Sequence, residues 1–186
     1  MTEGKLIVIS APSGCGKTTI AKTILAKNPM MLFSVSATTR PIRVGEINGM
    51  DYFFLTKQEF ENRIRMGDLV EWEEIYGNYY GTLKSEIHRA IDHGYSMIFD
   101  VDVKGALSIQ RHFPNESVLI FIKPPSMEVL KKRLENRKTE NPDALKRRLD
   151  RVPMELDQGS QFDFQVVNDD LKRAVAEVDE IVQRKK

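Results

Sequence analysis

A short apolar run that passes through two glycines into a helical pattern constrains the fold of this chain more than any other feature of its sequence. Residues 5–10 are Lys-Leu-Ile-Val-Ile-Ser, and a helical pattern covers residues 18–27. A buried strand followed by a glycine-rich turn and a helix predicts the first unit of an α/β fold. The turn and the first helical residue are Ala11, Pro12, Ser13, Gly14, Cys15, Gly16, Lys17 and Thr18.

The second half of this turn, Gly-Lys-Thr, matches the pattern of a phosphate-binding loop, although Ala11 stands where the general pattern has glycine. Gly14 and Gly16 allow successive backbone N–H groups to converge on phosphate oxygens, and the helix N-terminus adds the positive end of its dipole. Lys17 is expected to supply a positive charge and Thr18 a hydroxyl ligand for Mg²⁺. The alternative is a turn that only caps a helix. Because both the strand and the helix are present, we interpret residues 11–18 as an ATP-binding loop.

Cys15 is the single cysteine of the chain, so it can form neither an internal disulfide nor a thiolate metal site by itself. This favours a reducing, cytoplasmic setting. No evident base would activate Cys15 as a catalytic nucleophile. Phosphoryl transfer between two anions does not require a protein nucleophile, so we interpret Cys15 as a loop residue. Its place at the electropositive start of a helix predicts a favoured thiolate that is readily alkylated and that ATP protects.

Further strand-like runs at 32–35, 97–101, 118–122 and 164–167 alternate with helical patterns, which predicts a parallel sheet covered by helices on both faces. Residues 37–81 break this alternation with strand-like pieces at 51–55 and 69–75 around a helix at 57–66, and we interpret them as an inserted subdomain. Thr56 and Glu59 are expected to form the capping box of that helix, and Gly67 to end it. Between Arg137 and Asp143 the segment KTENP interrupts two arginine-rich helices, as a lid would.

The formal net charge of +1 argues against a general affinity for nucleic acid or for an anionic membrane surface. Hydrophobic residues make up 41% and charged residues 30% of the chain, as in a globular protein. No window approaches the roughly 20 apolar residues of a membrane span, and the N-terminus lacks a signal-like pattern, so a cytoplasmic location is expected.

Several ordered motifs give the chain a close resemblance to the guanylate kinase family. After the phosphate loop come the stretch SxTTRxxRxGExxGxDY from Ser36 to Tyr52, the triplet Val70-Glu71-Trp72 and the run Gly77-Asn78-Tyr79-Tyr80-Gly81-Thr82. Asp100-Val101-Asp102, an arginine-rich lid and Val167-Asn168-Asp169 follow in order. The resemblance implies a P-loop NTPase-type parallel sheet flanked by helices, with a core of residues 1–36, 83–126 and 158–186, a GMP-binding insert at 37–82 and a helical lid at 127–157.

The resemblance also implies roles for individual residues in the binding of GMP. Arg40, Arg43, Tyr52 and Tyr80 would hold its phosphate. The guanine would be recognised by Glu71, Thr82 and Ser36, with support from Asp102. Other interpretations exist: the tyrosines could be packing residues, and Glu71 could belong to an exposed acidic edge. Trp72 is interpreted as a core residue.

Asp100 ends an apolar strand, where the carboxyl edge of a parallel sheet faces a ligand crevice, and it is expected to orient waters on Mg²⁺. Asp102 could instead cap the helix at 103–112. The resemblance places Arg133, Arg137 and Arg148 of the lid against the ATP phosphates, although such charged helices are usually solvated faces. It makes Asn168 an adenine contact, with an ordinary helix cap as the alternative. Lys138 stands where the family often has glycine.

The implied activity is transfer of the γ-phosphoryl group of ATP to GMP, with Mg²⁺ as cofactor and the two nucleotides as small-molecule partners. One alternative is a monophosphate kinase for another base. The other is a catalytically silent guanylate kinase-like module that binds proteins. The sequence makes no prediction of oligomeric state.

Overall fold

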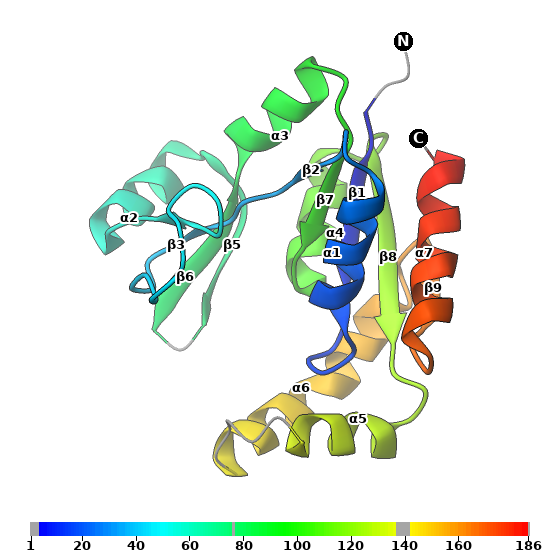
Figure 1. Cartoon of the computed structure of the whole chain (residues 1–186). Coiled ribbons are helices and arrows are strands. Elements are labelled where there is room, and N and C mark those ends of the chain that lie inside the picture. Colours follow the sequence, from blue (N-terminus) through cyan, green and yellow to red (C-terminus); the bar gives the residue numbers. More distant parts are fainter. Residues whose placement is uncertain (1–3, 76, 137–141, 186) are drawn as a thin grey trace.

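The computed structural model describes residues 4–75, 77–136 and 142–185 (Figure 1). Its larger sheet has five parallel strands in the order β2-β7-β1-β8-β9, which confirms the predicted α/β fold class. The strand predicted at 32–35 is only two residues long. The Ser34 N–H makes the last hydrogen bond to β7, and the chain then leaves the edge of the sheet. The strands are β1 (Leu6–Ser10), β2 (Leu32–Phe33), β7 (Met97–Asp100), β8 (Ser117–Lys123) and β9 (Phe164–Val167).

Alternate residues of the central strands point to opposite faces of this sheet, and each face has its own core. Ile7 and Ile9 pack with α1 and α7 on one face, whereas Leu6 and Val8 pack with α3 and α4 on the other. All four side chains are fully buried. Full burial of both faces explains why the strand is a continuous apolar run rather than an alternating one. The helices are α1 (Lys17–Lys27), α3 (Lys84–Asp92), α4 (Val103–His112) and α7 (Leu171–Lys185).

Residues 37–83 form a second, four-stranded sheet in the order β4-β3-β6-β5, which lies to one side of the parallel sheet (Figure 1). The strand-like piece at 51–55 contributes only Phe53–Phe54, because residues 47–52 form turns. Trp72 is 46% exposed and packs edge-on against Tyr79, so its interpretation as a core residue is wrong. The strands are β3 (Ala37–Thr38), β4 (Phe53–Phe54), β5 (Leu69–Ile75) and β6 (Asn78–Leu83).

Helix α2 (Lys57–Met66) has the caps that its sequence predicts. The Thr56 hydroxyl accepts a hydrogen bond from the Glu59 N–H, and the Glu59 carboxylate accepts one from the Thr56 N–H at 2.7 Å. Gly67 ends the helix with a φ of 70°, in the left-handed region that favours glycine. Phe60 anchors this helix to the smaller sheet, where it is fully buried beside Ala37 and Leu83.

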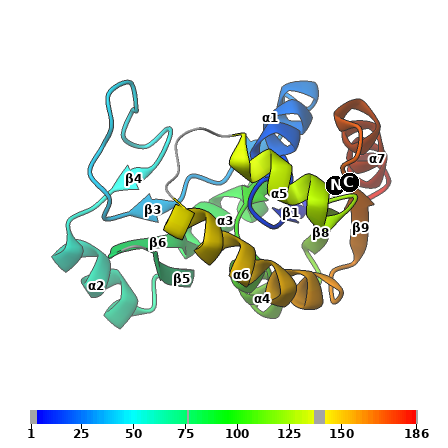
Figure 2. The same cartoon turned by 90° about the horizontal axis from the view of Figure 1, so that it is seen from below.

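Helices α5 (Met127–Glu135) and α6 (Pro142–Gly159) lie across the edge of the sheet at which the parallel strands end (Figure 2). The same edge carries the loop between β1 and α1. The residues at the ends of β1, β7 and β9 therefore meet at this edge, where Asp100 contacts Thr18 and Asn168 contacts Cys15. In the part of the chain that the structure describes, no helix is both long enough and apolar enough to span a membrane.

Candidate functional site

The loop between β1 and α1 takes its shape from two glycines in the left-handed backbone region. Gly14 has a φ of 91° and Gly16 a φ of 84°, values that residues with a side chain rarely adopt. A Cβ atom on Gly16 would also lie 2.6 Å from Nδ2 of Asn168. Both glycines are therefore required by the fold of the loop.

Asn168 ties the end of β9 to this loop. Its side-chain Nδ2 donates to the Cys15 carbonyl at 2.8 Å, and its backbone N–H donates to the Lys123 carbonyl at 2.9 Å. The side chain is 5% exposed. The structure thus places Asn168 at the loop that the sequence assigns to ATP, and its contact with adenine stays a prediction.

The structure contradicts the expectation of a reactive thiolate at Cys15. The side chain is fully buried in the core beneath the loop. Burial raises the pKa of the thiol to about 12, although the charge of Arg133 acts in the opposite direction. Desolvation of the charged form is the largest cause of this shift. Cys15 is therefore a packing residue and is held in the protonated form.

Lys17, Thr18 and Asp100 form one connected polar group at the start of α1. The Lys17 ammonium lies 2.8 Å from Oδ1 of Asp100 and donates to the Val101 carbonyl at 2.7 Å. The Thr18 hydroxyl donates to Oδ2 of the same aspartate at 2.6 Å. Asp100 thus positions both side chains that the sequence predicts for phosphate and Mg²⁺.

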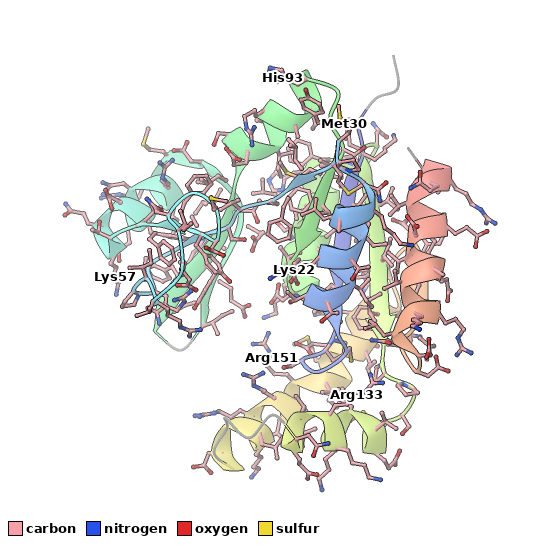
Figure 3. All side chains as sticks on the ribbon, viewed as in Figure 1. Lys22, Met30, Lys57, His93, Arg133 and Arg151 are labelled. Carbon is pink, nitrogen blue, oxygen red and sulfur yellow. The ribbon has the colours of Figure 1, made fainter. Side chains whose placement is uncertain are left out.

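Two of the three predicted lid arginines contact the phosphate-loop region. Arg148 on α6 donates to the Ser13 hydroxyl at 2.6 Å, and Arg133 on α5 donates to the Asn168 carbonyl at 2.9 Å. Figure 3 shows Arg133 and Arg151 on the two helices beside the loop. Arg137 and Lys138 lie outside the described residues.

A cavity of about 330 Å³ joins the loop to the opposite wall of the cleft. On one side it is lined by residues 11–19. On the other side it is lined by Ile75 of the smaller sheet, by Asp102, and by Arg148, Arg151 and Glu155 of α6. The cavity therefore reaches from the phosphate loop to Asp102, which the sequence predicts as a support of the guanine site, and to the end of β5 at Ile75.

Arg40 is held in a fixed orientation by a residue that sequence reasoning missed. Glu46 accepts two hydrogen bonds from its guanidinium, at 2.7 and 3.0 Å, and also one from the Arg43 N–H at 2.7 Å. These bonds hold the pKa of the Glu46 carboxyl below its usual value. The Arg40 guanidinium also lies 5.3 Å from the centre of the Tyr52 ring. Such a bidentate pair pre-organises the arginine.

The remaining predicted phosphate contacts lie around Arg40. The rings of Tyr52 and Tyr80 are 6.2 Å apart and pack edge to face, and burial raises the pKa of Tyr52. Arg43 is exposed on the neighbouring turn. The Ser36 carbonyl accepts from the Phe53 N–H, which places Ser36 just before β3. The structure thus groups Arg40, Tyr52 and Tyr80.

Glu71, Thr82 and Asp102 form a second cluster at the junction of β5, β6 and α4. The fully buried Thr82 hydroxyl donates to Oε1 of Glu71 at 2.6 Å. Burial raises the pKa of Glu71 to about 7, and the bond from Thr82 only partly opposes this. Asp102 also caps α4, because Oδ1 accepts from the Gly105 N–H at 2.8 Å. The capping alternative is thus confirmed for Asp102.

The parallel sheet, the glycine loop at its carboxyl edge and the paired Lys17 and Thr18 define a nucleotide-binding protein of the P-loop type. The sequence profile of the guanylate kinase family matches residues 3–185. The chain therefore belongs to the guanylate kinase family.

Individual relatives agree with this assignment. The guanylate kinase of Chlorobium luteolum is 49% identical over 94% of this chain and 89% of its own length. That of Chlorobaculum tepidum is 50% identical over 94% and 90%. The crystal structure of guanylate kinase from Anaplasma phagocytophilum matches with a TM-score of 0.78 and 28% identity, covering 99% of this chain and 87% of that one.

Proposed function

We propose that this chain transfers the γ-phosphoryl group of ATP to GMP, with the phosphate loop as donor site and residues 37–82 as acceptor-binding insert. The observation that supports this most is the shared cavity, which brings the phosphate loop and Asp102 to one space. Anionic substrates placed there would meet Lys17 and Arg148, which line this cavity. Helices α5 and α6 would form the lid over the donor site.

Catalysis by such a site is a matter of position and charge. Lys17 with Arg133, Arg137 and Arg148 would stabilise negative charge on the transferring group, while Arg40 and Arg43 would aim the phosphate of GMP. A general base is unnecessary, because the second ionisation of a phosphate monoester has a pKa of about 6 and leaves its oxygen free at neutral pH. Closure of the insert and the lid would exclude water.

The oxygen donors at the start of α1 fit Mg²⁺, which binds through one or two carboxylates together with substrate phosphates. Thr18 would be a direct ligand, and Asp100 would hold waters of the ion. When bound, Mg²⁺ supplies positive charge that screens the phosphates from each other. The partly buried Lys17–Asp100 ion pair keeps the donor side chains in place for this role.

A panel of acceptors tests the proposed substrate. Initial rates of ADP formation would be measured with ATP, Mg²⁺ and one of GMP, AMP, UMP or TMP. We expect a rate with GMP that exceeds the others by orders of magnitude. A higher rate with another monophosphate would indicate a kinase for that base, and no acceptor-dependent ADP at all would indicate a silent binding module.

Arg40→Ala is expected to raise the KM for GMP by about 10- to 100-fold, because bonds between two charged groups contribute about 1.5–3 kcal/mol each. The KM for ATP should change little, since Arg40 lies in the insert. Arg65→Ala on the exposed side of α2 is the matched control. An equal rise in the KM for GMP and in the KM for ATP would show that Arg40 does not belong to the acceptor site.

The raised pKa of Glu71, about 7, predicts a pH dependence of GMP binding. Guanine donors require the ionised carboxylate, so the KM for GMP should rise as the pH falls from 8 to 6. Glu71→Gln should remove the contribution of this carboxyl group near pH 7, so the KM for GMP should depend less steeply on pH than in the unsubstituted protein. Superimposable pH profiles for the two proteins would contradict this.

A further inference from the structure

Arg151 is the cation of a four-residue cluster where α6, β5 and α4 meet, and none of the roles above uses it. Its Nη2 lies 3.5 Å from Oδ2 of Asp102 and 3.8 Å from Oε1 of Glu73. Its Nε lies 3.6 Å from Oε1 of Glu155, one turn along the same helix. One guanidinium on the lid helix thus faces three carboxyl groups, one each from the insert, the core and the lid.

These ion-pair distances are longer than hydrogen bonds, so Arg151 provides charge to the acids without saturating them. Oδ2 of Asp102 and Oε2 of Glu73 are buried and accept no hydrogen bond from any described residue. Oδ1 of Asp102 is already taken by the Gly105 N–H. Buried acceptors without a donor are costly, which points to a donor supplied by a ligand.

The cluster is continuous with the site assigned to guanine. A Cβ atom on Gly105 would lie 3.1 Å from Oε2 of Glu71 and 3.2 Å from Oδ1 of Asp102, so the two carboxyl groups flank the same glycine. Arg151 and Asp102 also line the cavity at the phosphate loop. Asp102 therefore lies between Glu71 on the base side and Arg151 on the lid side.

We propose that Arg151 is a positioning residue for acceptor recognition. Its positive charge keeps the Asp102 carboxyl group oriented to accept from the exocyclic amino group of guanine, while Glu73 anchors Arg151 to the insert. The inference rests on the proposed GMP specificity. Without Arg151, Asp102 and Glu73 would lose the positive charge that faces both of them, and repulsion between the two acidic groups would turn Asp102 away from this orientation.

The electrostatics of the cluster agree with this geometry. Burial, together with the neighbouring Asp102, raises the pKa of Glu73 to about 7, and the charge of Arg151 acts in the opposite direction. Lys104 on α4 also lowers the pKa of Glu73. Burial likewise raises the pKa of Glu155, which Arg151 and the more distant Lys17 oppose. Arg151 is thus the positive charge that most strongly lowers the pKa of each of these two glutamates.

The test compares GMP with inosine monophosphate, which lacks the exocyclic amino group. In Arg151→Gln we expect kcat/KM for GMP to fall about tenfold and that for inosine monophosphate to change less than about twofold, with the KM for ATP retained. Arg147→Gln, which removes an exposed arginine from the same helix, is the matched control and should keep the ratio. Arg151→Lys should preserve most of the ratio, because it keeps the charge.

A second substitution separates positioning from packing. Glu73→Gln in the Arg151→Gln background should restore part of the preference for GMP, because it removes the acidic group that repels Asp102 once Arg151 is absent. A further loss in the double variant would overturn the proposal. So would equal losses for the two acceptors in Arg151→Gln, a selective rise in the KM for ATP, or an Arg151→Lys variant as poor as Arg151→Gln.

Different results would contradict the proposed activity and the proposed role of Arg151. If the unsubstituted protein forms no ADP with GMP, the proposed function is wrong. If it phosphorylates GMP but does not prefer it to inosine monophosphate, or if Arg151→Gln keeps that preference, only the role of Arg151 is wrong.

Discussion

Lys17→Met is expected to lower the rate of phosphoryl transfer from ATP to GMP by at least about 10²-fold, because loss of one group that stabilises charge in the transition state typically costs this much or more. Methionine keeps the length of the side chain but removes the ammonium that would face the ATP phosphates. It also leaves Asp100 without the partner that now lies 2.8 Å away. Initial rates at saturating ATP and GMP measure the effect.

Lys22→Met is the matched control for this variant. Lys22 is exposed on the same helix α1, so its loss should leave the rate nearly unchanged (Figure 3). Circular dichroism and thermal unfolding check that both variants fold. Near-normal turnover in a folded Lys17→Met protein would show that Lys17 has no role in the reaction.

Glu71→Ala should narrow the preference for GMP over AMP more than any other single substitution. Guanine presents N1–H and its amino group side by side, and a carboxylate accepts from both. Adenine has no donor at N1, so Glu71 would stay desolvated and unpaired at a cost of about 1–3 kcal/mol or more. Sites that accept a hydrogen bond from a donor on the substrate reject analogues that lack this donor by factors on the order of 10⁴.

The ratio of kcat/KM for GMP to that for AMP measures this preference. Glu74→Ala, on the exposed face of the same strand, should leave the ratio unchanged. The KM for ATP should be unaffected in both variants. Full discrimination in Glu71→Ala would mean that another group recognises the base.

Features encoded by neighbouring residues could be predicted closely from the sequence. The capping box of α2, its terminal glycine and the bounds of β5 agree with the structure residue by residue. The phosphate loop was recognisable for the same reason, because its glycines, lysine and threonine are consecutive. Local hydrogen bonds fix these elements before any long-range packing is considered.

Features that depend on long-range packing were missed. The sequence placed Cys15 in a favourable field, but burial beneath the loop dominates its pKa. Trp72 was expected in the core, yet the face of β5 that carries it is largely open. No local pattern pairs Arg151 with Glu73, which lies far away in the sequence.

Two missed residues did carry a signal. Glu46 follows Arg43 by three residues in a turn, a spacing at which a carboxylate can accept from a backbone N–H. Glu73 follows Glu71 by two residues in a strand, so the two share a face. The same spacing rules that identify buried apolar residues, applied to acidic residues, would have placed Glu46 and Glu73 at the site.

The fate of the γ-phosphoryl group tests the central claim most directly. The protein would be incubated with Mg²⁺, ATP labelled with ³²P at the γ position and GMP, and the nucleotides then separated. The account predicts that the label moves to GDP, in an amount equal to the ADP formed and only when GMP is present. Label that stays on ATP, or that appears as inorganic phosphate regardless of GMP, would contradict it.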